Sequence, residues 1–150
     1  MSEAGTSADA ASHLLDFWLG SWEVLSPARE RLGENDITAV LGGAALIERW
    51  RDVDGGEGMS LFYCVAGGVW KQVWVTDRAA YKEKALVGRP AAGGVIFQGV
   101  VQGRSGHYLD RTTLTPLPGG EVRQVIETST DGGATWALGF DALYVRRGRR

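Results

Sequence analysis

The sequence predicts an all-β fold: an antiparallel up-and-down β-barrel of about ten strands, closed at one end by a short N-terminal helix. From Gly20 onward, apolar and polar residues alternate with a period of two, which is typical of strands with one buried face. Glycine-rich turns separate these segments, and links this short join antiparallel neighbours. A series of hairpins closes most economically into a barrel without open edges. A two-sheet sandwich is the alternative, but its crossings need longer loops.

Composition and length set the general class. A chain of 150 residues fits one domain, and we expect residues 1–8 to be disordered and 9–150 to form the barrel. The net charge of −2 gives no reason to expect a nucleic acid or an anionic membrane as partner. No apolar run is long enough to span a bilayer, and no secretory signal is recognisable, so the expected location is cytoplasmic. Formation of a homodimer stays open.

The expected elements follow from the turns between them. Asp9 or Ser12 is placed to cap a helix of roughly two turns, which Gly20 ends. Ten strands follow, and their predicted ranges are 20–26, 34–41, 44–52, 58–65, 69–76, 80–87, 94–101, 107–115, 121–129 and 135–146.

Basic residues indicate which face of each strand points inward, because lysine and arginine on a barrel strand normally face water. The residues placed outside by this rule are Arg49, Arg51, Lys71, Lys82, Lys84 and Arg123. The alternating positions placed inside include Glu48, Trp50, Trp70, Gln72, Trp74, Tyr81, Glu83 and Gln124.

Two strands need a separate argument. In 135–146 the bulky residues Trp136, Leu138 and Phe140 share one face, and their size suggests that this face is the inner one. In 107–115, Asp110 and Arg111 lie on opposite faces, so the inward face stays open. Placing Arg111 inside would give the inward acids a partner.

A barrel of about ten strands is too wide for side chains to fill, so we expect a cavity. The first hypothesis is a binding site for a small apolar or aromatic ligand with a polar or acidic end. Its walls would be Trp50, Trp70, Trp74, Tyr81, Trp136 and Phe140, and its polar groups Glu48, Gln72, Arg111 and Gln124. The second is a cyclase or isomerase that uses Glu48 or Glu83 for proton transfer, although both acids also suit an internal ion pair with Arg111. The third is a structural or interaction protein with a filled barrel.

Gly20-Ser21-Trp22, placed after a short helix, resembles the Gly-x-Trp step of the calycin superfamily, which includes lipocalins and fatty-acid-binding proteins. The opening Asp16-Phe17-Trp18-Leu19-Gly20-Ser21-Trp22-Glu23-Val24 is also similar to that of small lipocalin-like bacterial proteins. The resemblance implies that Trp22 packs across the barrel floor, covered by Arg146 or Arg147 of the last strand. It implies nothing about a particular ligand.

Other motifs indicate no cofactor or metal. Nitrobindin-like haem barrels of the same superfamily need a histidine near the C-terminal strands, whereas the two histidines here are His13 and His107. With Cys64 as the only cysteine, these residues make no expected metal site. The stretch Ser129–Trp136 resembles the Asp-box of sialidases, whose propellers are far longer than this chain. We therefore expect only its turn: the aspartate caps turn amides and the tryptophan packs under the loop.

Overall fold

The computed structural model describes residues 13–148, and they form a closed barrel of ten antiparallel strands. Each strand pairs with its neighbours in sequence, and β1 pairs with β10 to close the barrel. The strands are β1 (Gly20–Leu25), β2 (Arg31–Val40), β3 (Ala45–Asp52), β4 (Glu57–Val65), β5 (Val69–Thr76), β6 (Tyr81–Gly88), β7 (Val95–Gly103), β8 (Gly106–Pro116), β9 (Val122–Ser129) and β10 (Ala137–Arg146). The predicted fold class is confirmed, and every predicted strand is present within a few residues of its expected ends.

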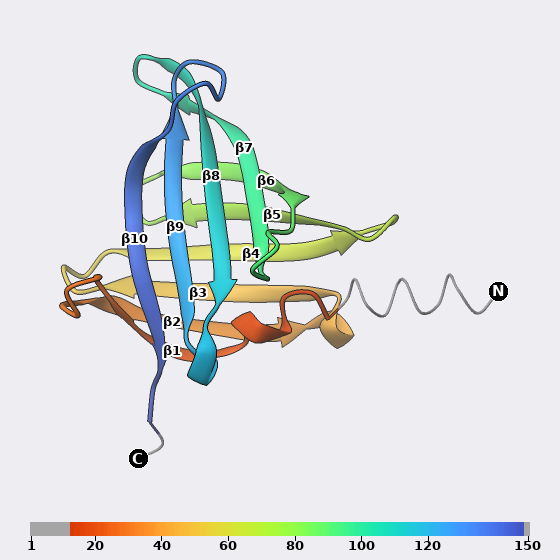
Figure 1. Ribbon diagram of the computed structural model, residues 1–150, viewed down its shortest axis with the longest axis vertical. Coiled ribbons are helices and arrows are strands. Elements are labelled where there is room, and N and C mark those ends of the chain that lie inside the picture. Colours follow the sequence, from red (N-terminus) through yellow and green to blue (C-terminus); the bar gives the residue numbers. More distant parts are fainter. Residues whose placement is uncertain (1–12, 149–150) are drawn as a thin grey trace.

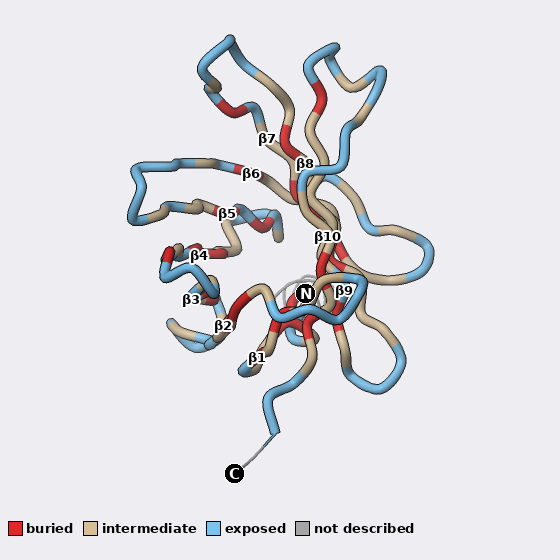
Figure 2. Tube along the Cα trace, turned by 90° about the vertical axis from the view of Figure 1, so that its left-hand side faces the viewer, coloured by how far each residue is buried: buried red, intermediate tan, exposed pale blue. Residues whose placement is uncertain are grey.

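The strands form two groups that cross steeply (Figure 1). In that view β1–β6 run across the molecule and β7–β10 run along it, so that the β7–β8 and β9–β10 hairpins extend beyond the other strands. The ends of these two hairpins are mostly exposed, and buried positions gather lower down, where the two groups meet (Figure 2). The core therefore lies where the two groups of strands meet, away from the ends of the β7–β8 and β9–β10 hairpins.

The N-terminal segment contributes aromatic residues to the barrel floor. Its only helical element among the described residues is the 3-10 turn η1 (Asp16–Trp18), so the expected helix of two turns is wrong for this part. The predicted disorder of residues 1–8 and the proposed caps at Asp9 and Ser12 lie outside the described residues. Trp18 is fully buried, with its ring centroid 4.7 Å from that of Tyr144 and 5.9 Å from that of Trp22.

Arg146 closes the floor at the junction of β1 and β10. Its guanidinium lies 4.3 Å from the ring centroid of Trp22, and its Nη1 donates to the carbonyl oxygen of Leu19 at 2.9 Å. Trp22 Nε1 in turn donates to the carbonyl oxygen of Trp18 at 3.0 Å. The expected basic cover of Trp22 is therefore Arg146. Arg147 instead approaches Glu34 at 3.4 Å.

Candidate functional site

A cavity of about 330 Å³ lies inside the barrel, above the floor formed by Trp18 and Trp22. Side chains from six strands converge on it. They are Glu48, Trp50, Asp52, Gln72, Trp74, Lys82, Lys84, Thr112, Gln124, Ile126, Phe140 and Tyr144. Rings and charged or amide groups thus share the same walls, which is the usual make-up of a small-molecule site.

Two glycines make room for the tryptophans of the wall. A Cβ at Gly58 would lie 2.2 Å from Cη2 of Trp74, and a Cβ at Gly33 would lie 2.7 Å from Cη2 of Trp50. Each indole therefore approaches a neighbouring strand at a residue that has no side chain. Phe140 completes this wall, with its ring edge-on to Trp50 at a centroid distance of 6.4 Å.

The orientation of β6 is the reverse of the predicted one. Lys82 and Lys84 line the cavity, and the Lys84 side chain is only 4% exposed. Tyr81, 55% exposed, and Glu83 lie on the outer surface, so the expectation that these two residues point inward is wrong. The rule that lysine faces water fails here because the barrel interior supplies a countercharge.

That countercharge is Asp110 of β8, which is fully buried. Lys82 Nζ donates to Asp110 Oδ2 at 2.7 Å, and Lys84 Nζ contacts Asp110 Oδ1 and donates to Thr112 Oγ1 at 2.6 Å. The lysines reach across the intervening strand β7 near Gly99, which pairs with Asp110. A Cβ at Gly99 would lie only 1.9 Å from the carbonyl oxygen of Glu83, so β6 and β7 approach closely at this point because residue 99 has no side chain.

The same face of β8 settles the position of Arg111. Because Asp110, Thr112 and Leu114 are buried inside, Arg111 lies on the outside and does not line the cavity as the first hypothesis expected. Its guanidinium donates to Glu127 at 3.1 Å and stacks 3.8 Å from the ring centroid of Trp136. The expected ion pair of Arg111 with Glu48 or Glu83 is therefore absent.

A β-bulge explains why the predicted inward face is wrong at the start of β10. The register shifts between Leu138 and Phe140, which leaves Gly139 as an extra residue opposite β9. Phe140 accordingly points into the cavity as expected, whereas Leu138, 66% exposed, points out. Trp136 precedes the strand and packs outside against Arg111, so its predicted place on the cavity wall is wrong.

Glu48 lies within a hydrogen-bonded group of side chains beside the cavity. Asn35 Nδ2 donates to Glu48 Oε2 at 2.7 Å, and Gln72 Nε2 donates to Ser60 Oγ at 3.0 Å. Burial raises the pKa of Glu48, and this effect outweighs the hydrogen bonds from Asn35 and Ser60. Gln124 Nε2 donates to the Tyr144 hydroxyl at 3.1 Å, and burial raises the pKa of that phenol well above its usual value.

Charged groups of both signs line the cavity. Lys82 and Lys84 share the carboxylate of Asp110, and burial raises the pKa of Glu48. Burial lowers the pKa of Lys84, although the charge of Asp110 opposes this shift. Asp52 lies at the end of β3, where its Oδ1 accepts hydrogen bonds from the turn amides of Asp54 and Gly56.

Six of the ten residues expected to bind a ligand do line this cavity: Glu48, Trp50, Gln72, Trp74, Gln124 and Phe140. Trp70 points inward as expected but is fully buried in the core away from the cavity. The sequence reasoning missed Lys82, Lys84 and Thr112. One pattern in the sequence could have indicated them. Asp110 and Thr112 share a face of their strand with the apolar Leu114, and an aspartate buried on such a face needs inward cations.

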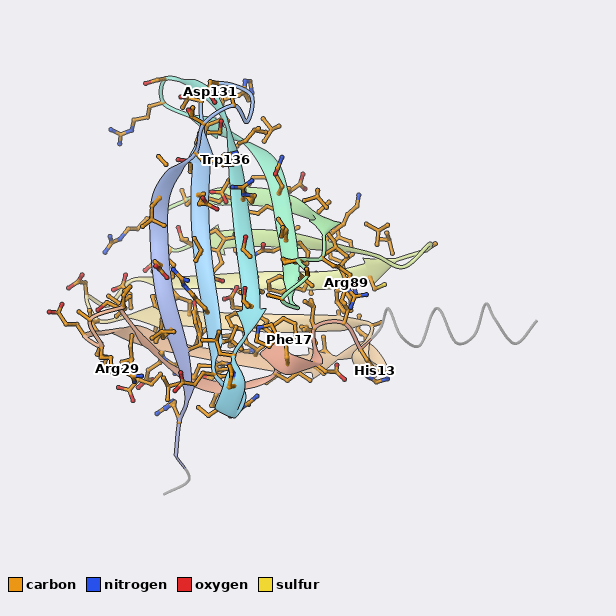
Figure 3. The ribbon with its side chains drawn as sticks, viewed as in Figure 1. His13, Phe17, Arg29, Arg89, Asp131 and Trp136 are labelled. Atoms are coloured by element: carbon orange, nitrogen blue, oxygen red, sulfur yellow. The ribbon has the colours of Figure 1, made fainter. Side chains whose placement is uncertain are left out.

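The Asp-box stretch is a turn remote from the cavity. Asp131 accepts hydrogen bonds from the backbone N–H and the hydroxyl of Thr135, and these bonds lower its pKa to about 2. The predicted capping role is therefore confirmed. Asp131 and Trp136 lie at the extended end of the β9–β10 hairpin (Figure 3), outside the barrel interior.

Fold and cavity together define a closed antiparallel barrel with a polar and aromatic internal site, compatible with a lipocalin-like architecture. No family model matches the chain, and no curated protein matches its sequence. Among residues 13–148, no three metal-binding side chains come together as a ligand set. No helix in the same range has the length and apolarity needed to cross a membrane.

Proposed function

We propose that this barrel binds a small molecule with an aromatic or apolar body and an acidic end. One observation carries the proposal: the cavity joins a wall of rings to two inward lysines that share a single carboxylate. At about 330 Å³ the cavity lies at the lower end of ligand sites, so it suits a compact ligand.

The aromatic body has a defined place in this proposal. Trp50, Trp74 and Phe140 line the cavity, where stacked and edge-on contacts with a ligand ring would add to the free energy of burying it. Gly33 and Gly58 hold the two indoles back against the strands, which keeps the volume between them open.

The acidic end of the proposed ligand also has hydrogen-bond donors within the cavity wall. An ammonium group has three N–H donors. Lys84 uses two contacts, to Asp110 and Thr112, and Lys82 uses one, to Asp110. Both lysines line the cavity with donors left over, and two cations that share one carboxylate favour a carboxylate ligand over a neutral group. Lys82 and Lys84 thus take the role first expected of Arg111.

Tryptophan fluorescence tests the proposal, because Trp50 and Trp74 line the site. The probes are one-ring and two-ring aromatic carboxylates, their primary amides, fatty acids and haem. We expect a carboxylate to bind about tenfold or more tightly than its amide, since a charged hydrogen bond contributes ~1.5–3 kcal/mol. Lys84→Met should abolish this preference. Lys71→Met, on the outer face of β5, is the matched control and should retain it.

Two results would contradict the proposal. The first is equal affinity for each acid and its amide, which would remove the role of the lysines. The second is the absence of any response to the whole panel, combined with an interior packed with side chains in a crystal structure. That second result would favour the filled barrel of a structural or interaction protein.

A second candidate function is a cyclase or isomerase, and the position of Glu48 favours it. A buried carboxyl with a raised pKa beside an apolar wall is suited to proton transfer. Glu83 is no longer a candidate for this role, because it is exposed on the outer face. Glu48→Gln should then abolish turnover of a bound substrate while leaving its dissociation constant within about threefold. Turnover unaffected by this change would exclude Glu48 as the acid or base.

The floor of the barrel supports a further proposal, a relationship to the calycin superfamily. Gly20, Trp22 and Arg146 make the contacts that the resemblance implies: the guanidinium covers the indole and donates to the chain that enters β1. These residues are scaffold under this proposal, since none of them lines the cavity.

A further inference from the structure

The outer face of β3–β6 has an unusual composition. The outward side chains form two rows across the four strands, defined here as the β3–β6 face. They are Arg49, Met59, Val75 and Tyr81 in the first row and Ile47, Leu61, Val73 and Glu83 in the second. Six of these eight side chains are apolar or aromatic, and the four strands lie side by side (Figure 1).

The inner face of the same strands mixes apolar rings with polar residues, whereas in a sheet with one side in water the outer face is usually the polar one. Glu48, Ser60, Gln72 and Lys84 are all buried inside. Outside, Leu61 is 42% and Val75 42% exposed. A contiguous apolar patch on the outside of a barrel indicates a surface that another molecule covers.

We propose that this surface is the interface of a symmetric dimer, in which the β3–β6 face packs against the same face of a second copy. A two-fold axis that lies between β4 and β5 and follows their direction places β3 of one copy over β6 of the other. Met59 and Leu61 then face Val75 and Val73 of the partner subunit. Because the axis is two-fold, each contact forms twice.

The charged residues at the two borders of the patch fit this two-fold axis. Arg49 ends one row on β3, and Glu83 ends the other row on β6, at the diagonally opposite corner. Under the two-fold axis, Arg49 lies over Tyr81 of the partner subunit and one row from its Glu83. Neither Arg49 nor Glu83 takes part in the salt bridges found among residues 13–148, and Glu83 interacts with the hydroxyl of Tyr81 beside it. The two opposite charges can therefore attract each other across the interface.

A second copy suits the patch because it offers six apolar or aromatic side chains at matching positions. The same axis brings each Arg49 within one row of the partner's Glu83, which favours a second copy over an unrelated partner.

Sedimentation equilibrium from micromolar to millimolar protein tests the dimer. We expect the wild-type chain to dimerise and Leu61→Glu to raise the dimer dissociation constant at least tenfold. Leu138→Glu is the matched control: it changes an exposed leucine on β10, outside the patch, and should leave the constant unchanged. A monomeric wild-type chain at all concentrations would overturn the proposal, as would equal effects of the two variants.

A charge exchange tests the geometry even if Leu61→Glu fails to fold. Arg49→Glu and Glu83→Arg should each weaken the dimer, by about tenfold or more, because each places like charges together. The double variant restores opposite charges and should regain most of the wild-type affinity. A double variant as weak as the single ones would exclude this two-fold arrangement. Ligand binding in the cavity is not required for any of these outcomes.

Discussion

Replacing Asp110 by asparagine should be among the most damaging conservative changes in this barrel. The change keeps the shape of the side chain but removes the carboxylate that contacts both lysines. Lys82 is 25% exposed and can turn toward water, whereas Lys84 is 4% exposed and cannot. The cost therefore comes mainly from a buried, uncompensated ammonium on Lys84, and we expect a loss of about 3–5 kcal/mol in the free energy of unfolding.

A double-mutant cycle measured by urea unfolding at pH 7 isolates the free energy of interaction between Asp110 and Lys84. Lys84→Met alone leaves Asp110 paired with Lys82, so its cost should be about 1–3 kcal/mol. The double variant has no buried ammonium at position 84, and the two changes should be coupled by about 2 kcal/mol. Asp141→Asn is the control: it breaks the ion pair with the exposed Arg123 and should cost no more than about 1 kcal/mol. Additive effects, or a loss at Asp110→Asn no larger than at Asp141→Asn, would refute the reasoning.

Three further predictions concern the cavity and the strands around it. Burial raises the pKa of Glu48 above 4.5, so the folded state holds this proton more tightly than the unfolded state and loses stability as the pH rises above that value. Glu48→Gln should therefore match the wild type in urea unfolding at pH 4 and exceed it at pH 8, and no gain at pH 8 would contradict this. Gly99→Ala places a Cβ 1.9 Å from a backbone oxygen and should cost about 1–3 kcal/mol, whereas Gly88→Ala, whose nearest atom is 3.7 Å away, should be neutral in the same assay. Gly58→Ala should push the Trp74 indole into the cavity, shift tryptophan emission and weaken binding of an aromatic ligand by about tenfold, and unchanged emission would argue against this packing.

Much of the architecture could be predicted because turns and alternation are local properties of the sequence. Glycines mark most of the turns, although the β1–β2 and β5–β6 links (26–30 and 77–80) contain none. The outward arginines of β3 and β9 place Glu48, Trp50 and Gln124 correctly. In these strands the charged residues have water or another surface charge as partner, so the assumption that they face outward holds.

The wrong predictions arise where a residue outside the local pattern determines which way a side chain points. Lys84 points inward because Asp110, on a strand two positions away around the barrel, compensates its charge. Nothing within β6 itself carries that information. Trp136 lies outside because a single extra residue, Gly139, inverts the alternation part-way along β10. A pattern of period two reveals the faces of a strand only as long as the strand is regular.

The contact of Arg146 with Trp22 and Leu19 has a consequence for the order of folding. It joins segments separated by 127 positions, so the β1–β10 seam has the longest loop to close of any strand pair. Until β10 is in place, β1 and β9 are both open edges, and each can pair with another chain. A chain truncated before Ala137 would therefore present a nine-stranded sheet prone to intermolecular pairing. Closure of this barrel depends on the tenth strand.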